Sequence, residues 1–325
     1  MRNRWGLQAG VVLALALVTG AGWAQNAKAI ALSEDIHRYE LLVQKPPSQQ
    51  DGAAWCDLAK LYQDAARYED AEHAYTKAIA LFTTGDRTRL ANAMDGMGTM
   101  YVETGRYAQA QPLESKALAI REEQNDSVGV GRSWMHLAML SLGERNLADA
   151  ERYGEMATER LVPEHFGHQA STAATPEEKM TALIYLSLAR CARGSCTAGI
   201  TELKAAHDLA EASYDAQSFP VAYTNFLLGY ESWKSGDTQL AGELMKRGSA
   251  GMEEQLGWRH PTLISAMTQY EAFLRLTRHN DEAAEIGAKI AQALASSRRP
   301  SMEVGSEAML HPSVQPAATR TPSAP

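Results

Sequence analysis

The fold is decided by residues 55–81, WCDLAKLYQDAARYEDAEHAYTKAIAL, and by the related stretch 96–120, GMGTMYVETGRYAQAQPLESKALAI. Both stretches carry large and small residues at matching offsets. The first has Trp55, Leu58, Ala59, Tyr62, Ala71, Tyr75 and Ala78, and the second unit has Met94, Met97, Gly98, Tyr101, Ala110 and Ala117. Repeats of this length indicate stacked units that each contact only their neighbours.

Six units emerge when each is numbered so that the usually small residue of its first helix is position eight. These positions are 59, 98, 138, 187, 229 and 271, separated by 39, 40, 49, 42 and 42 residues. Large residues at positions four, seven and eleven share one helix face. Small residues at eight, twenty and twenty-seven let antiparallel helices approach closely. The sequence therefore predicts an all-α, right-handed α-solenoid of about six antiparallel helix pairs.

Turn and cap signals fall between the expected helices. Gly105, Gly194 and Gly236 can adopt a positive φ at low cost, as a tight turn requires. The stretch 175–178, TPEE, offers an N-cap, a proline at the first helical position and a capping-box glutamate. The fourth and fifth units depart from the pattern, with Arg190 and Ser232 at position eleven, so their register is left open.

Together these residues resemble tetratricopeptide repeats, and the 39-to-42 spacing resembles the longer kinesin-light-chain-like subtype. The resemblance covers about residues 52–294 and implies helix-turn-helix units with a concave, partner-binding groove. It places groove residues at fixed positions of each first helix, which here are Lys60, Asn92, Tyr185, Tyr223, Phe226, Tyr230 and Trp233. The lysine and asparagine set with which some relatives clamp a terminal carboxylate is missing, so that ligand class is not inherited.

The implied groove is polar at its first end and aromatic toward its last. Two interpretations of the aromatic end stay open. An exposed aromatic patch would mark a partner site, with Phe226 and Tyr230 as anchors. Alternatively, neighbouring helices cover these side chains, because longer repeats bury more of the groove.

Four segments follow from the composition. Residues 1–24 have two arginines, an uncharged apolar run and a small-x-small ending, which predict a signal peptide cleaved after Ala24. Residues 25–50 predict a capping helix and linker, 51–296 the repeat domain, and 297–325, rich in Ser, Pro, Ala and Thr, a disordered tail. We therefore expect an exported protein, periplasmic or extracellular, without stable membrane insertion.

Charge and motifs argue against several function classes. The formal net charge is −8, which opposes binding to nucleic acid or to anionic lipid. The chain has neither a nucleophile elbow nor a phosphate-binding glycine loop followed by lysine. We expect no enzymatic activity and no cofactor.

Cysteine and histidine residues give two local hypotheses. Cys191 and Cys196 flank an expected helix turn and can pair in an oxidising compartment, whereas Cys56 is expected to be a free, unreactive thiol. His165 and His168 lie in the excess loop 162–174 and are weak metal-ligand candidates. Their spacing matches no known helix pair of ligands, so polar residues in a surface loop explain them adequately.

The sequence thus predicts a non-enzymatic scaffold that binds a protein or peptide segment in its concave groove. Two alternatives stay open. One is an accessory module that binds a metal or small molecule near residues 162–174. The other is a self-assembling structural protein joined through the region of Trp233. The sequence names neither the partner nor the oligomeric state.

Overall fold

A computed structural model describes residues 27–46, 51–169, 173–258 and 260–297. The expected signal peptide at 1–24 and residues 298–325 of the expected tail lie outside the described residues. In the described part the helices are α2 (Ala27–Val43), α3 (Gly52–Asp64), α4 (Tyr68–Phe82), α5 (Arg87–Glu103), α6 (Tyr107–Glu123), α7 (Ser127–Glu144), α8 (Leu147–Leu161), η2 (Pro163–Phe166), α9 (Pro176–Arg193), α10 (Cys196–Ser213), α11 (Phe219–Ser235), α12 (Thr238–Leu256), α13 (Pro261–Leu276) and α14 (Asn280–Ser297). Every element of this part is helical, which confirms the all-α prediction.

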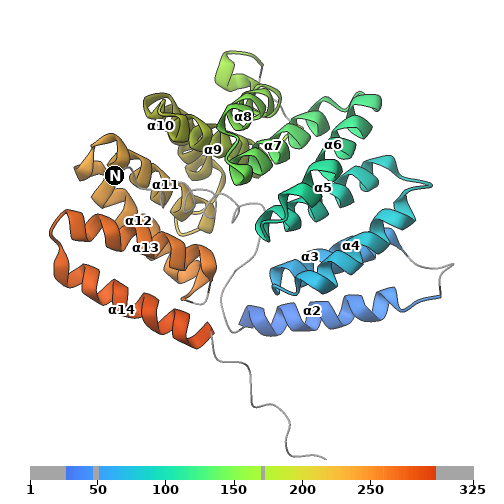
Figure 1. Ribbon diagram of the computed structural model, residues 1–325, viewed down its shortest axis with the longest axis horizontal. Coiled ribbons are helices and arrows are strands. Elements are labelled where there is room, and N and C mark those ends of the chain that lie inside the picture. Colours follow the sequence, from blue (N-terminus) through green and yellow to red (C-terminus); the bar gives the residue numbers. More distant parts are fainter. Residues whose placement is uncertain (1–26, 47–50, 170–172, 259, 298–325) are drawn as a thin grey trace, which may run out of the picture.

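Helices α3 to α14 form six antiparallel pairs that follow one another around an arc, from α2 at the blue end to α14 at the red end (Figure 1). Each helix packs mainly on its hairpin partner and on the next pair. Successive first helices also touch, in the pairs α3 with α5, α5 with α7, α7 with α9 and α11 with α13. This places the first helices on the inner, shorter radius of the arc, as the α-solenoid prediction requires.

The small residues let the helices approach as closely as the pattern predicts. Ala59 and Ala138, both at position eight, are fully buried. A Cβ atom on Gly248 of α12 would lie 2.5 Å from the backbone nitrogen of Phe226 in α11. That separation is far below a van der Waals contact, so only glycine fits where α12 crosses α11.

The hairpin turns fix the register of all six units. In every unit the residue seven places after position eight has a positive φ. These residues are Ala66 (56°), Gly105 (73°), Arg145 (64°), Gly194 (101°), Gly236 (103°) and Arg278 (65°). The three glycines confirm the predicted turns, and the regular spacing settles the register of the fourth and fifth units. Successive first helices begin 40, 49, 43 and 42 residues apart from α5 onward, longer than the roughly 34 residues of the common repeat.

The helix starts follow from local side chains. Thr175 and Glu178 form the predicted capping box, with Pro176 as the first residue of α9. Asp86 and Asp126 cap α5 and α7 by accepting hydrogen bonds from backbone N–H groups three residues on.

Helix α2 lies within the segment where a capping helix is expected. It packs on α3 and buries Ile36 and Val43. The Tyr62 hydroxyl of α3 donates a 2.7 Å hydrogen bond to Glu40 of α2. In the part of the chain that the structure describes, each helix is too short or too polar to cross a bilayer.

Candidate functional site

The second and third units enclose a cluster of polar side chains, all buried except the exposed Asn92, which we call the polar cluster. Its members are Asn92 and Asp95 of α5, Glu114 and Arg121 of α6, and Ser133 of α7. Arg121 is its centre and is only 2% exposed. Its guanidinium forms an ion pair with Asp95 and donates hydrogen bonds to Asn92 (2.8 Å) and Ser133 (2.6 Å). One side chain of α6 thereby connects α5 to α7.

The second carboxyl group of the polar cluster lies in surroundings that favour its neutral form. Glu114 is fully buried beneath Gly98, where a Cβ would lie 2.1 Å from its Oε1. Burial, and then the adjacent Asp95, raise the pKa of Glu114 well above its usual range. Neither Glu114 oxygen nor Oδ1 of Asp95 receives a hydrogen bond from another group. A proton on Glu114 would satisfy these oxygens, because its O–H can donate a hydrogen bond to Asp95. The positive charge of Arg121 then faces a single negative charge, that of Asp95.

The polar cluster continues toward the fourth unit. The Nδ1 atom of His136 on α7 lies 3.2 Å from the hydroxyl oxygen of Thr99 on α5. Burial lowers the pKa of His136, so the imidazole is neutral at pH 7. Arg132 of α7 forms an ion pair with Glu178 of α9 and keeps 31% of its side chain exposed. Predicted groove residue Asn92 is thus engaged by Arg121, while Lys60 on α3 is exposed.

The aromatic side chains at the last end of the predicted groove are buried rather than exposed. Tyr185, Tyr223 and Phe226 are 0% exposed and Tyr230 is 2% exposed, all within the hydrophobic core. An exposed aromatic patch at these four residues is therefore wrong, and the covered interpretation is the one that the structure supports. Their role in partner binding stays a prediction. The physical reason is that α10 packs closely on both α9 and α11, and α12 packs closely on α11, so large side chains between these helices are enclosed.

These rings form what we call the aromatic cluster, namely Tyr185 of α9 with Phe219, Tyr223, Phe226 and Tyr230 of α11. The ring of Phe219 stacks on that of Tyr223 at 5.4 Å between centroids. Burial raises the pKa of Tyr223, and its buried hydroxyl has no hydrogen-bond partner. Predicted groove residue Trp233 is half-buried, with its ring edge-on to Tyr230 (6.0 Å) and Phe273 (5.6 Å).

The inserted loop is fixed by ion pairs and does not assemble the suggested histidine site. His165 in η2 pairs with Glu202 of α10, and its ring lies edge-on to Phe166. His168 is exposed. Lys179 of α9 donates a 2.6 Å hydrogen bond to Glu164. His165 is thus engaged by a carboxylate of the repeat body, which explains its position without a metal.

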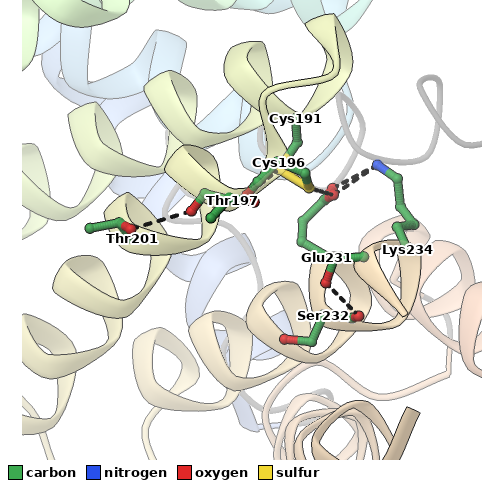
Figure 2. The surroundings of a disulfide bond; sticks show 8 residues. Cys191, Cys196, Thr197, Thr201, Glu231, Ser232 and Lys234 are labelled. Carbon is green, nitrogen blue, oxygen red and sulfur yellow. Dashed lines mark hydrogen bonds and ion pairs between the residues drawn. A yellow bond between two sulfur atoms is a disulfide. The ribbon is translucent and has the colours of Figure 1, made fainter. Parts of the chain in front are cut away.

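The two predicted cysteines are joined in a disulfide at the turn between α9 and α10 (Figure 2). Beside it lies Glu231 of α11, whose carboxylate receives hydrogen bonds from Lys234 at 2.8 and 3.0 Å. Burial raises the pKa of Glu231, and Lys234 acts in the opposite direction. Cys56 is free, as expected, and burial raises the pKa of its thiol to about 11, which disfavours the reactive thiolate.

Sequence reasoning missed Arg121, Glu114 and Glu231. Arg121 precedes Glu122 and Glu123 in the last turn of α6, a pattern typical of a solvated helix face. Glu231 lies in a helix whose polar residues follow no clear period. The nearest signal was Gly98 at position eight, because a glycine there leaves room for a side chain from the partner helix.

Comparisons with known proteins agree with this architecture. Residues 50–123 match the family model described as tetratricopeptide repeat. No curated protein matches the sequence. The apo structure of RapI is 14% identical, with 82% of this chain and 93% of that chain covered and a TM-score of 0.62.

Two further solved structures are similar. One is a signal transduction ATPase with a tetratricopeptide repeat sensor from Pyrococcus horikoshii, at 14% identity, with 81% of this chain and 38% of that chain covered and a TM-score of 0.60. The other is NprR in complex with its cognate peptide NprX, at 12% identity, with 83% and 79% covered and a TM-score of 0.51. These likenesses concern the fold. With six hairpins in one register and a family match over residues 50–123, this chain has a tetratricopeptide-repeat-like fold.

Proposed function

We propose that this protein is a non-enzymatic interaction scaffold that binds a peptide segment of a protein partner along the inner face of its first three units. The observation that carries this proposal is a difference in accessibility. Lys60 and Asn92 are exposed on α3 and α5, and Arg132 on α7 is partly exposed. The equivalent faces of α9 and α11 are buried.

The accessible inner side chains favour a polar partner segment of mixed charge. Asp57 and Lys60 on α3 offer one charge of each sign, and the partly exposed Arg132, which is ion-paired with Glu178, adds a second cationic group. The structure of NprR with its cognate peptide supports the idea that this kind of solenoid accommodates a peptide. The polar cluster beneath these residues fixes the spacing of α5 and α7, so the surface is preorganised for binding.

A photo-reactive amino acid placed on either face of the array tests this function. At Asn92 or Lys60, on the inner face, we expect covalent capture of a partner in the cells that produce the protein. At Lys116, an exposed residue of the second helix α6, we expect none. Capture from Lys116 alone, or equally from all three positions, would overturn the proposed face.

A charge reversal measures the contribution of the surface once a partner is captured. Lys60→Glu should weaken its binding by roughly tenfold, which is about 1.4 kcal/mol. Lys77→Glu is the matched control, since Lys77 is an exposed lysine on the second helix of the same unit. Equal affinities of the two variants would remove Lys60 from the site.

We further propose that the protein is exported. The arginine-led apolar segment 1–24 supports this, and so does the disulfide at the α9–α10 turn, because disulfides persist in oxidising compartments. N-terminal sequencing of the protein from fractionated cells should begin at Gln25. An intact Met1 in the cytosolic fraction would contradict export.

A further inference from the structure

Three potential metal ligands meet where the fourth unit packs on the fifth. Cys191 lies in the last turn of α9, Cys196 is the first residue of α10, and Glu231 projects from α11 toward them (Figure 2). One ligand atom from each of the three lies within 4.8 Å of the others. Among the described residues no other group of three or more such side chains comes this close.

The burial of Glu231 is the unusual part of this arrangement. A disulfide needs no carboxylate, yet Glu231 is only 1% exposed and its Oε2 lies 3.4 Å from Sγ of Cys196. Burying a charged group is unfavourable unless it is paired. Lys234 donates to both carboxylate oxygens from the more exposed side, and Oε2 also faces the cysteines.

The chemistry of this donor set points to one class of ion. Two thiolates and a carboxylate suit zinc, which takes sulfur and oxygen ligands in tetrahedral geometry. Cys196 lies at the N-terminus of α10, where the helix dipole favours a thiolate. Water can occupy a fourth position, because Cys196 is only partly buried.

We propose that Cys191, Cys196 and Glu231 form a zinc site in the dithiol form of the protein, and that disulfide formation abolishes it. Oxidation by a peroxide joins the two sulfurs and transfers their two electrons to the O–O bond. The two oxygens then leave as water with two protons from solvent, and the ion is released. Reduction by a phosphine reverses this, because water supplies the oxygen of the phosphine oxide and the two thiol protons.

Cobalt is the probe, because its tetrahedral thiolate complexes absorb in the visible and near ultraviolet. The full chain carrying Cys56→Ser is reduced with a phosphine, freed of reductant without oxygen and titrated with Co²⁺, then with Zn²⁺. We expect one equivalent of cobalt to bind and zinc to displace it. The disulfide form of the same protein should give no such spectrum. No absorption in the reduced protein, or an equal one in the oxidised protein, would overturn the site.

Two variants separate this site from ordinary thiol binding. Glu231→Gln keeps the shape and one of the two oxygens that accept from Lys234, and we expect it to weaken zinc binding at least tenfold. Glu243→Gln, at an exposed residue of α12, is the matched control and should bind like the parent. Cys196→Ser should abolish the thiolate absorption while the helical circular dichroism is kept. Unchanged zinc affinity in Glu231→Gln would remove the carboxylate and refute the proposal.

Discussion

The second and third units and the fourth and fifth units fill equivalent interior space in different ways. Around α5, α6 and α7 the space holds the polar cluster, in which Arg121 is satisfied by Asp95, Asn92 and Ser133. Around α9 and α11 it holds the aromatic cluster, packed with rings and buried to 2% exposure or less at Tyr185, Tyr223, Phe226 and Tyr230. The same backbone therefore tolerates either interior, provided that every buried charge has a partner.

The difference has a consequence for stability. Ion pairs depend on the protonation of both partners, whereas ring packing does not. The polar interior also specifies one arrangement of three helices, because a shifted α6 would leave Arg121 uncompensated. The aromatic interior owes more of its stability to the burial of apolar surface than the polar interior does. The two regions should respond differently to substitution and to pH.

The largest effect is expected for Arg121→Met. It removes the only cation that the structure pairs with Asp95 within the polar cluster, so a buried carboxylate loses its compensation. We expect a loss of about 3–5 kcal/mol in unfolding free energy at pH 7, measured by urea unfolding followed by circular dichroism. A loss below 1 kcal/mol would show that the pair contributes little.

Tyr230→Ala tests the other interior. The ring is nearly fully buried, so its removal should leave a cavity and cost about 3 kcal/mol. This loss should be the same at pH 4 and pH 7, because ring packing does not depend on protonation. A strong pH dependence would contradict a purely apolar role for the region. Tyr68→Ala, at a half-buried ring of α4, is the control and should lose less.

Glu114→Gln isolates the pH dependence of the polar cluster. The pKa of Glu114 is raised in the folded protein, so its stabilising contribution is complete below the ordinary pKa near 4.3 and is lost as pH rises through the folded value. In that window unfolding releases one proton, and stability falls by up to about 1.4 kcal/mol per pH unit. The variant should lose this slope between pH 5 and pH 7. An unchanged slope would mean that Glu114 is ionised in the folded state.

The smallest effect is expected for Tyr223→Phe. The substitution removes a buried hydroxyl that has no hydrogen-bond partner and keeps the ring that stacks on Phe219. We expect unfolding free energy to rise by about 1 kcal/mol, because an unsatisfied polar group is no longer buried. A clear decrease in stability would show that the hydroxyl is satisfied in solution.

The repeat count, the helix pairs and the capping box were all predictable, because small residues, turn glycines and helix caps act locally. The turns at Ala66, Arg145 and Arg278 were not, since no glycine marks them and neighbouring units impose the positive φ. Burial of the aromatic cluster was also beyond the pattern. It depends on how closely α10 and α12 pack against α9 and α11, which the positions along one helix do not reveal.

The candidate site was predicted less well than the fold. Lys60 and Asn92 were placed on the inner side from their repeat positions, and the spacing of Cys191 and Cys196 indicated their bond. Arg121 was missed because its partners come from two other helices, with sequence separations of 12 to 29 residues. Glu231 was missed for the same reason, since it meets the cysteines only through the packing of α10 on α11.

The residue with a positive φ at the turn of each hairpin makes the helix pairs structurally alike. Because all six hairpins turn at one register position with a similar φ, a helix pair behaves as an interchangeable module. A duplicate of residues 87–126 inserted after residue 126 should extend the array by one module without disturbing the others. The protein could thus be lengthened or shortened in whole steps, each of which changes the reach of its inner surface by a fixed amount.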